Sequence, residues 1–418
     1  MNINMDLNIL STFDSDDYQN KQYTYNNNIY NIIKYNKDKL KDYEKNDIEK
    51  FKVLSKYRSV IVRDNKVVVY SPGKSIDYEN FKTSNNTSDV ILEDFIDGTM
   101  INVFYDNINN TWEIATKSTV GGNIIFFNDI KNYSYFNTSD YKEKFEKTTF
   151  RSMFFECCEF INLNLESLNK SYCYSFVMQH PFNRIVTPVI TPCLFLINIY
   201  CIDNKNYPNI SINHIDINQY INTIPYPFLN TAIKIPNKYE LDSYENLELH
   251  YKNIKTHYTC VGTMIYNKSG DRTKIRNPNY EEVRKLRGNH PKLQYNYLML
   301  KKENKVVEFL HYYPECRIIF NKFKILIYNY TNELFLNYIS CFIRKEKPLK
   351  EYEFQYKVHL YNIHKKYITE LRESNKIVDK KVIIDYVNSL HPAQQMFVIN
   401  FKNNKMCTAN VESMEVTT

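Results

Sequence analysis

The sequence predicts an α+β protein in which a domain of mostly antiparallel sheet is followed by an all-helical C-terminal domain. Short β-branched runs separated by turn residues recur up to about residue 280, and beyond Asn279 the apolar residues follow helical spacing. The chain has only seven glycines, and none lies between Asn289 and Thr418. A chain this poor in glycine is expected to keep it where φ is positive or where the backbone approaches a ligand closely.

Two β-hairpins are predicted early in the chain. The first is SVIVRDNKVVVYS, in which Asp64-Asn65 joins two apolar β-branched runs. The second joins TMINVFYD to WEIATKS through the turn-rich residues 107–110. Further strands are predicted at Tyr172–Val177, Arg184–Val189, Cys193–Tyr200 and Tyr258–Tyr266.

The helices of the second half carry terminal signals. Asn279 is a cap followed by acidic residues, Gly288 is a stop, and Pro291 opens the next helix. Longer amphipathic helices, separated by prolines, are predicted at Phe320–Arg344, Leu349–Glu373 and Lys380–Leu390. The domain prediction is therefore a polar, partly helical lead-in over 1–50, a sheet domain over 51–280, a helical domain over 281–405 and a flexible tail over 406–418.

Composition limits the class of protein. The net charge of +7 favours an anionic partner weakly, and nine cysteines without any CxxC pair indicate free thiols in a reducing compartment, not a metal site. The N-terminus lacks the basic region of a signal peptide, and no apolar run is as long as a membrane span. A soluble cytoplasmic protein without membrane contact is expected. The wealth of Asn, Lys, Ile and Tyr is typical of AT-rich coding, as in a large DNA virus, where the place would be the host cytoplasm or the virion.

The glycines lie in strings that mix turn residues with polar or basic side chains. These strings indicate a surface that faces phosphate or nucleotide between about residues 55 and 290. They are SPGKS (71–75), IDGT (96–99), TKSTVGGN (116–123), VGTMI (261–265), SGDRTKIR (269–276) and LRGN (286–289).

Read in order, the longer strings YRSVIVRDNKVVVYSPGKS, EDFIDGTMINVFYD, WEIATKSTVGGN, YSFVMQHPFNRIVTP, TCVGTMIY and TKIRNPNY resemble the motifs of bacteriophage-type ATP-dependent RNA ligases. That family belongs to the covalent nucleotidyltransferases, and the resemblance covers roughly residues 55 to 290. It implies an adenylation domain followed by a helical domain, with ATP and Mg²⁺ as the cofactors of an active member. RNA or a nucleoside triphosphate would be the partner, and the helical domain could receive a protein.

The resemblance assigns nucleotide- or phosphate-binding positions to a set of cations and to the Asp-Gly pair of IDGT. Arg58 and Lys74 stand at the two ends of the first hairpin, and alternation on a strand points Lys274 and Arg276 to one face. The full set is Arg58, Lys74, Asp97, Gly98, Lys117, Lys274 and Arg276.

Three groups that the family needs for catalysis are missing. The lysine that would attack the α-phosphorus of ATP is replaced by Phe95, which cannot be a nucleophile. The two glutamates that would hold the metal are replaced by Ser175 and Val261, and no carboxylate occurs between Ser171 and Ile190. The pattern predicts a pseudoenzyme with no catalytic residue and no metal ligand, whose cations leave the cleft electropositive around an apolar floor.

Other residue patterns in the sequence are better explained by a structural role than by catalysis or ligand binding. His180 is more often a loop hydrogen-bonding residue than a general base, and Gly73-Lys74-Ser75 lacks the earlier glycine of a P-loop. The Tyr-rich helices are expected to use their rings as core, with base stacking as the alternative.

Three functions stay open from the sequence. The first is a degenerate RNA-ligase-like protein that binds RNA or a nucleotide. The second is an active ligase or nucleotidyltransferase with a relocated nucleophile, Lys74 or Lys117. The third is a structural or virion-associated protein that uses the fold as a scaffold.

Overall fold

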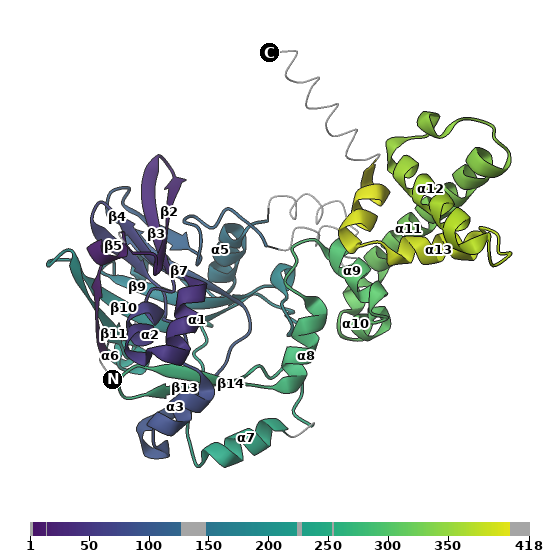
Figure 1. The fold of residues 1–418 in the computed structure, drawn as a ribbon. Helices are drawn as coiled ribbons and strands as arrows, with labels where there is room; N and C mark the ends of the chain where they lie inside the picture. Colours follow the sequence, from purple (N-terminus) through teal and green to yellow (C-terminus); the bar gives the residue numbers. More distant parts are fainter. Residues whose placement is uncertain (1–2, 14, 127–147, 224–227, 253–254, 402–418) are drawn as a thin grey trace. The chain divides into compact units, whose positions relative to one another are not determined.

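The computed structural model of the chain describes residues 3–13, 15–126, 148–223, 228–252 and 255–401. Among these residues every named strand lies before Asn277, and the regular elements that follow are helical (Figure 1). The predicted fold class, α+β with antiparallel sheets and a helical C-terminal region, is confirmed. The predicted tail 406–418 lies outside the described residues.

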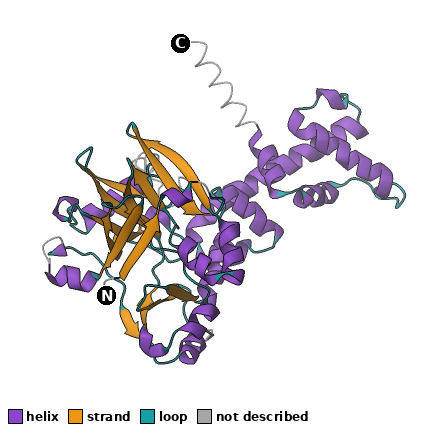
Figure 2. Ribbon diagram, turned by 60° about the vertical axis from the view of Figure 1, so that its left-hand side comes forward, coloured by secondary structure: helices purple, strands orange, loops and turns teal. Residues whose placement is uncertain are grey.

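Three antiparallel sheets form the first part of the chain (Figure 2). The six-stranded sheet has the order β1 (Ile3–Asn8), β11 (Asn209–Ile215), β10 (Cys193–Asp203), β9 (Tyr172–Gln179), β7 (Thr99–Asp106) and β8 (Thr111–Ala115). A four-stranded sheet has the order β12 (Lys238–Glu240), β6 (Val90–Asp94), β13 (Gly262–Asn267) and β14 (Arg272–Arg276). The other four-stranded sheet has the order β2 (Tyr18–Tyr25), β3 (Asn28–Tyr35), β4 (Val60–Arg63) and β5 (Lys66–Tyr70).

Both predicted hairpins are confirmed. Strands β4 and β5 pair across Asp64 and Asn65, whose φ angles of 48° and 58° are those of a tight two-residue turn. Strands β7 and β8 pair across residues 107–110, where Asn110 has a φ of 51°. Asn and Asp tolerate this left-handed conformation better than other residues with a side chain, which is why the turns could be read from the sequence.

The prediction of a polar, partly helical lead-in over residues 1–50 is wrong for its first 35 residues, which contain three strands. β1 pairs with β11 at the edge of the six-stranded sheet, and β2 and β3 form a hairpin that joins β4. The hairpin turns at Asn26-Asn27, and its buried side carries Tyr30 and Ile32, both fully buried. Asparagines on the exposed side of these strands made the alternation of apolar and polar residues difficult to recognise in the sequence. Helices α1 (Lys37–Asn46) and α2 (Ile48–Ser55) follow.

The predicted strand Arg184–Val189 is also wrong. These residues form a loop, although their apolar β-branched composition favours a strand. The backbone N–H groups of Val186 and Thr187 donate to the Asp97 carboxylate at 3.1 and 2.9 Å, so they are not available to a neighbouring strand. The hydrogen bonds to Asp97, which is distant in the sequence, therefore outweigh the local preference of these residues for a strand.

The contacts divide the chain into two compact units, residues 1–125 with 147–285, and residues 126–146 with 286–418. The other helices of the first unit are α3 (Tyr78–Ser84), α5 (Phe150–Phe160), α6 (Ile217–Thr223), α7 (Tyr244–Lys252) and most of α8 (Pro278–Arg287). The second unit contains α9 (Leu293–Lys302), α10 (Val306–Tyr312), α11 (Arg317–Tyr338), α12 (Phe354–Lys366) and α13 (Lys380–Ser389). No helix of the described part of the chain is long and apolar enough to cross a membrane.

Aromatic rings form much of the core of the helical unit, as expected from their spacing. The Phe309 ring stacks on Phe320 with centroids 4.9 Å apart, and Tyr297 meets Phe320 edge to face at 5.0 Å. Tyr330 is buried, and its hydroxyl donates to the carbonyl of Gln355, so α11 is joined to α12. Burying a tyrosine hydroxyl requires such a partner.

One buried ion pair joins two of the sheets in the first unit. Arg63 at the end of β4 donates to Asp106 at the end of β7 over 2.7 Å, and both side chains are almost fully buried. Arg63 also donates to the Tyr30 hydroxyl and to Asn28, while Asp106 accepts from the Asn109 side chain. The charges are therefore paired and hydrogen-bonded, as burial requires.

Replacing Arg63 by Leu should lower the free energy of unfolding by about 3 kcal/mol, because it leaves the Asp106 carboxylate buried without its charge partner. Urea denaturation followed by circular dichroism would measure the change. The matched control is Lys66→Leu on the exposed start of β5, expected within about 0.5 kcal/mol of the wild type. A loss no larger than that of the control would contradict a stabilising role for the pair.

Candidate functional site: a cluster of cations around Phe95

Strand β14 directs its basic residues to one face of its sheet. Side chains alternate along a strand, so Arg272, Lys274 and Arg276 share a face. The antiparallel register places Lys274 opposite Met264 and Arg276 opposite Gly262 of β13. The sequence analysis named Lys274 and Arg276 and missed Arg272, which the same two-residue period would have found.

Phe95 lies beneath these cations. It directly follows β6, and its backbone N–H donates to the Gly262 carbonyl at 3.3 Å. The Lys274 Nζ lies 5.9 Å from the centroid of the Phe95 ring, and the Arg276 Cζ lies 5.4 Å from it. Both distances are within the range of cation–π attraction, so the ring gives two like charges a common partner that has no charge of its own.

The pKa of Lys274 shows that other cations are near it. Desolvation, followed by the positive charges of Arg276, Lys74, Arg58 and Arg272, lowers this pKa from 10.5 to about 8. Each of these charges disfavours a proton on Lys274, which happens only over short distances or in poorly screened surroundings. Four of the five predicted cations therefore interact in one region.

Lys117, the fifth predicted cation, belongs to the same region. Its pKa is lowered to about 8 by desolvation and then by the charges of Arg58, Lys34 and others that include Lys74. Its Nζ lies 5.4 Å from the centroid of the Tyr35 ring. We call Arg58, Lys74, Lys117, Lys274 and Arg276 the cation cluster.

Arg58 is a half-buried guanidinium of the cluster. Desolvation and, after it, the charge of Arg272 lower its pKa to about 10, while Tyr35 and Tyr200 act in the opposite direction. Arg58 stands directly before Ser59 and β4, at one base of the first hairpin. A permanently charged group held in this position contributes a fixed positive potential.

Lys74 is held at the other end of the hairpin by its backbone. Its N–H donates to the Ser55 carbonyl at 2.8 Å, and its Nζ donates to the Ser75 carbonyl at 3.1 Å. A Cβ at Gly73 would lie 3.1 Å from the Ser55 oxygen, which is tighter than ordinary contacts allow. Glycine at this position lets the strand end approach α2 and brings Lys74 toward the cluster.

Arg276 is partly neutralised, which the sequence analysis did not foresee. Its Nη1 contacts the Glu281 carboxylate at 2.5 Å, and the same carboxylate accepts from Arg284 at 2.7 Å. Glu281 lies in the first turn of α8, one turn beyond the strand, and no sequence motif pointed to it. The charge around Phe95 is therefore less one-sided than the five cations alone suggest.

The two positions that lack a metal-binding glutamate are filled differently. Ser175 is fully buried and donates to the Asn102 side chain at 2.7 Å, and Asn102 donates to Ser71 at 2.8 Å. Val261 is buried, and its carbonyl accepts from the Asn277 N–H at 3.0 Å. Among the described residues no group of three or more His, Cys, Asp or Glu side chains is arranged to hold a metal ion.

Asp97 and Gly98 are held by contacts with other parts of the protein. The buried Asp97 carboxylate accepts from two N–H groups of the 184–187 loop and from the Tyr280 hydroxyl at 2.9 Å. Gly98 has a φ of 143°, and a Cβ there would lie 2.5 Å from the Met178 carbonyl. The Asp97 side chain is therefore occupied by protein donors, and Gly98 cannot be replaced without moving β9.

His180 also has a structural setting. Its Nδ1 accepts from the Phe182 N–H at 3.1 Å, and its Nε2 lies 3.6 Å from the Glu156 carboxylate. The side chain is almost fully buried. The expectation of a loop hydrogen-bonding residue describes this geometry better than a general base.

Comparison with known proteins finds sequence similarity over part of the chain. No family model matches the chain. A segment of 119 residues, 28% of this chain, is 32% identical to an RNA ligase of Rhodothermus phage RM378, and it spans 24% of that protein. A solved structure described as "Putative ATP-dependent DNA ligase from Aquifex aeolicus" aligns with a TM-score of 0.40 at 10% identity, over 78% of this chain and 80% of the other.

The fold class and the cation cluster define an α+β protein with an electropositive site. Over about a quarter of its length, the chain is similar in sequence to a phage RNA ligase.

The lysine pKa values can be measured directly. Reductive ¹³C-methylation followed by NMR titration should give Lys274 and Lys117 midpoints near pH 8, whereas an unperturbed lysine titrates near 10.4. Arg276→Gln should raise the Lys274 midpoint because it removes a neighbouring positive charge. The control Lys268→Gln, on the turn between β13 and β14, should leave the midpoint unchanged. Midpoints near 10.4 for both lysines would show that the cations are not clustered.

Proposed function

We propose that this chain is a ligase-like nucleotidyltransferase-fold protein that binds RNA or a nucleoside triphosphate through the cation cluster and forms no covalent nucleotide intermediate. The observation that carries the proposal is the position of Phe95. It stands where the resemblance to RNA ligases requires a nucleophilic lysine, and Lys274 and Arg276 lie over its ring. A phenyl ring can hold these cations in place but cannot attack phosphorus.

The electrostatics support an anionic ligand. Desolvation is the first cause of the pKa of about 8 for Lys274 and for Lys117, and repulsion by neighbouring positive charges in the unliganded protein is the second. A phosphate group placed among them would relieve this repulsion and restore the protons to the lysines. A polyanion that binds among the clustered cations removes their mutual repulsion, and this change favours binding.

A metal ion has no evident place in this proposal. In ligases, a metal held by carboxylates neutralises charge that develops on the phosphates. Here the cations can supply that neutralisation to a ground-state ligand, and the only carboxylate bonded to the cluster in the described region is Glu281, which is paired with two arginines. We therefore propose ground-state binding that is independent of Mg²⁺, not phosphoryl transfer.

The first test measures binding of ATP, GTP and a 5′-phosphorylated RNA oligonucleotide with EDTA or with Mg²⁺. The wild type should bind equally well in both, and its affinity should fall steeply with salt because counterions are released. The variant with both Lys274→Ala and Arg276→Ala should bind about 100-fold more weakly, since two charge-assisted phosphate contacts are lost.

The matched control carries Lys66→Ala and Lys268→Ala, which remove the same charge from exposed positions of the same unit. It should retain at least a third of the wild-type affinity (about 0.6 kcal/mol). Binding that requires Mg²⁺, or that survives the loss of Lys274 and Arg276, would sink the proposal.

A second candidate function is an active nucleotidyltransferase with a relocated lysine. One observation favours it: a pKa near 8 leaves a sizeable fraction of Lys117 as neutral amine at neutral pH, and only the neutral amine is nucleophilic. Lys74 is the other candidate, but its Nζ donates to the Ser75 carbonyl.

Incubation with Mg²⁺ and with ATP or GTP labelled at the α-phosphate separates the two functions. We expect no covalent label that stays on the protein in denaturing gel electrophoresis at neutral or alkaline pH, because neither a nucleophile at residue 95 nor the two carboxylates is present. If a label forms, Lys117→Arg and Lys74→Arg identify the lysine, since arginine keeps the charge and cannot form the adduct. A label abolished by either variant would establish the second function and overturn the first.

The proposal extends to the setting of the protein. We propose a nucleotidyltransferase-like domain that includes the strands before residue 51 and extends to about residue 280, and a helical domain over about 281–405 that can receive a protein partner, in a cytoplasm or a virion. The AT-rich style of the composition and the phage origin of the similar RNA ligase support a viral source. A scaffold without ligand remains the third alternative, and failure of the binding test would favour it.

A further inference from the structure

Three lysines lead away from the cation cluster across the β2–β3 hairpin. They are Lys34 near the end of β3, Lys21 on β2 and Lys37 at the start of α1. The motifs that resemble ligase motifs begin at about residue 55, so these lysines have no place in them. All three belong to the first unit, as the cation cluster does. We call Lys21, Lys34 and Lys37 the lysine track.

Two serine hydroxyls connect the lysine track to the cation cluster. The Ser59 Oγ donates to the Lys117 carbonyl at 3.1 Å, so the backbone of Lys117 lies beside the start of β4 and the neighbouring Arg58. The Ser118 Oγ accepts from the Lys34 Nζ at 2.8 Å. Because Ser118 directly follows Lys117, this bond holds the first lysine of the track next to the last cation of the cluster.

The register of the β2–β3 hairpin places Lys21 beside Lys34. Lys34 pairs with Gln19, and Lys21 pairs with Ile32. Paired residues of antiparallel strands point to the same side of the sheet, and so do residues two positions apart on one strand. Lys21 and Lys34 therefore share one face as diagonal neighbours, which in a sheet lie about 7–8 Å apart.

The lysines of the track and the cluster also interact through their charges. Desolvation, followed by the charges of Lys21 and Lys37, lowers the pKa of Lys34. Lys34 and Lys37 in turn contribute, after desolvation and Arg58, to the lowered pKa of Lys117. Within the described part of the chain, none of the track lysines makes an ion pair with a carboxylate, and neither does Lys117. Uncompensated positive charge thus continues from the cation cluster to Lys21.

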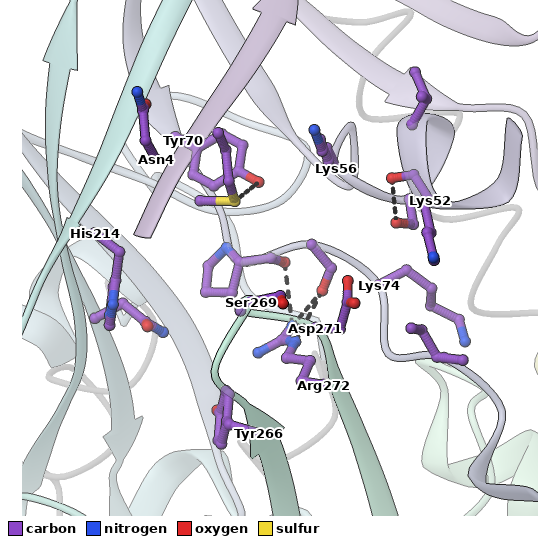
Figure 3. A pocket seen from close by; sticks show the side chains of 18 of the residues that line it. Asn4, Lys52, Lys56, Tyr70, Lys74, His214, Tyr266, Ser269, Asp271 and Arg272 are labelled. Atoms are coloured by element: carbon purple, nitrogen blue, oxygen red, sulfur yellow. Dashed lines mark hydrogen bonds between the residues drawn. The ribbon is translucent and has the colours of Figure 1, made fainter. Parts of the chain in front are cut away.

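On another side of the cluster, carboxylates balance the positive charge. Lys52 and Lys56 of α2 line a cavity of about 360 Å³ together with Lys74 (Figure 3). Glu49 and Asp271 line the same cavity, and Glu49 pairs with Lys52 over 3.2 Å. A polyanion that left the cluster in this direction would meet negative charge, so the lysine track is the more favourable path.

The surroundings of the track favour a nucleic acid over a protein. Lys21 and Lys37 are exposed and Lys34 is half-buried, and the residues bonded to or paired with Lys34, namely Gln19 and Ser118, are polar. The centre of a protein–protein interface is usually apolar and poor in charge. A site for single-stranded nucleic acid instead has successive cations that follow the phosphate backbone.

The length of the path favours an RNA strand over a free nucleotide. A triphosphate bound among the five cations of the cluster has no phosphate left for the track, whereas each further nucleotide of an RNA strand adds one phosphate. The track also lies on a different sheet from Lys274 and Arg276, which are on β14. Cations on both sheets can therefore be used together only by an extended polyanion.

We propose that the lysine track binds the phosphodiester backbone of a single RNA strand whose end lies in the cation cluster. The strand passes from Lys117 to Lys34 and then to Lys21, with Lys37 beside it. This inference rests on the proposed function and deepens it, because it selects an RNA strand over a free nucleotide and gives the direction in which the strand leaves the cluster.

The experiment measures how tightly the full-length protein binds ATP and two 5′-phosphorylated single-stranded RNAs, a dinucleotide and a decanucleotide, over a series of salt concentrations. At the lowest salt the wild type should bind the decanucleotide at least about tenfold more tightly than the dinucleotide, because more phosphates are neutralised. The variant with Lys21→Gln, Lys34→Gln and Lys37→Gln should lose that advantage. Its slope of log K against log salt should be flatter by about 2, since each phosphate contact on a single strand contributes about 0.7. Its affinity for ATP should change less than about threefold.

The matched control carries Lys66→Gln, Lys205→Gln and Lys268→Gln, which remove the same charge from exposed positions of the first unit outside the track. It should keep the wild-type preference for the decanucleotide and the wild-type salt slope. Thermal unfolding verifies that the triple track variant is folded. If replacement of the half-buried Lys34 disturbs folding, the variant with only Lys21→Gln and Lys37→Gln, both at exposed positions, decides the matter: its slope should be flatter by about two thirds of the triple effect.

The outcomes separate this inference from the proposed function. Binding of ATP that Lys274 and Arg276 support, with equal affinity for the two RNAs or with track variants that behave like the control, overturns the lysine track and leaves the proposed function intact. RNA binding that needs the track but persists without Lys274 and Arg276 supports the track as an RNA site and overturns the proposed function, together with the placement of the strand end.

A polyglutamate peptide of ten residues tests the other class of polyanion. Binding of this peptide as tight as that of the decanucleotide, and weakened equally by the track variants, would assign the track to an acidic protein segment and overturn the RNA assignment. Absence of binding to ATP and to both RNAs overturns the track and the proposed function together.

Discussion

The buried Asp97 carboxylate is the interaction on which the site depends. Its oxygens accept from the N–H groups of Val186 and Thr187 and from the Tyr280 hydroxyl, and its carbonyl accepts from the Gln179 side chain. One residue thus ties the β6–β7 connection to the end of β9, to the loop that follows it and to α8. Because Phe95 lies two residues before Asp97, the same bonds fix the ring beneath Lys274. Asp97 and Gly98 thus have a structural role that does not depend on any catalytic group at residue 95.

Repulsion within the cation cluster is the second constraint. Desolvation and, after it, neighbouring positive charges lower the pKa values of Lys274 and Lys117 to about 8. Two features offset the repulsion near β14, namely the Phe95 ring under Lys274 and Arg276, and the Glu281 carboxylate beside Arg276. A lysine at residue 95 would add a further positive charge at this point. Uncharged residues at Phe95, Ser175 and Val261 are therefore compatible electrostatically with the cation cluster.

The parts of the fold that could be predicted are those with local signals. Asp64-Asn65 set one hairpin turn, and prolines marked the later helices, whereas the predicted cap Asn279 lies inside α8, which begins at Pro278. The strand at residues 184–189 could not be excluded, because the carboxylate that captures its N–H groups lies about ninety residues earlier in the sequence. Cations of the site were found through motif order, whereas Arg272 required attention to strand alternation. Glu281 was beyond sequence reasoning, since its neighbours are set by tertiary packing and leave no spacing to read.

The distribution of charge along the chain bears on the proposed alternatives of RNA and a free nucleotide. Residues 286–401 contain 19 Lys and Arg against 11 Asp and Glu, so this helical segment carries a net charge of +8, while the rest of the chain is close to neutral. In the first unit, positive charge is thus concentrated at the cation cluster and balanced by carboxylates elsewhere. A free triphosphate needs only such a local site. A polyelectrolyte also gains from a diffuse positive surface, because each neutralised phosphate releases counterions. The proposed binding of RNA would therefore gain from the excess of basic residues in the helical segment as well as from the cation cluster.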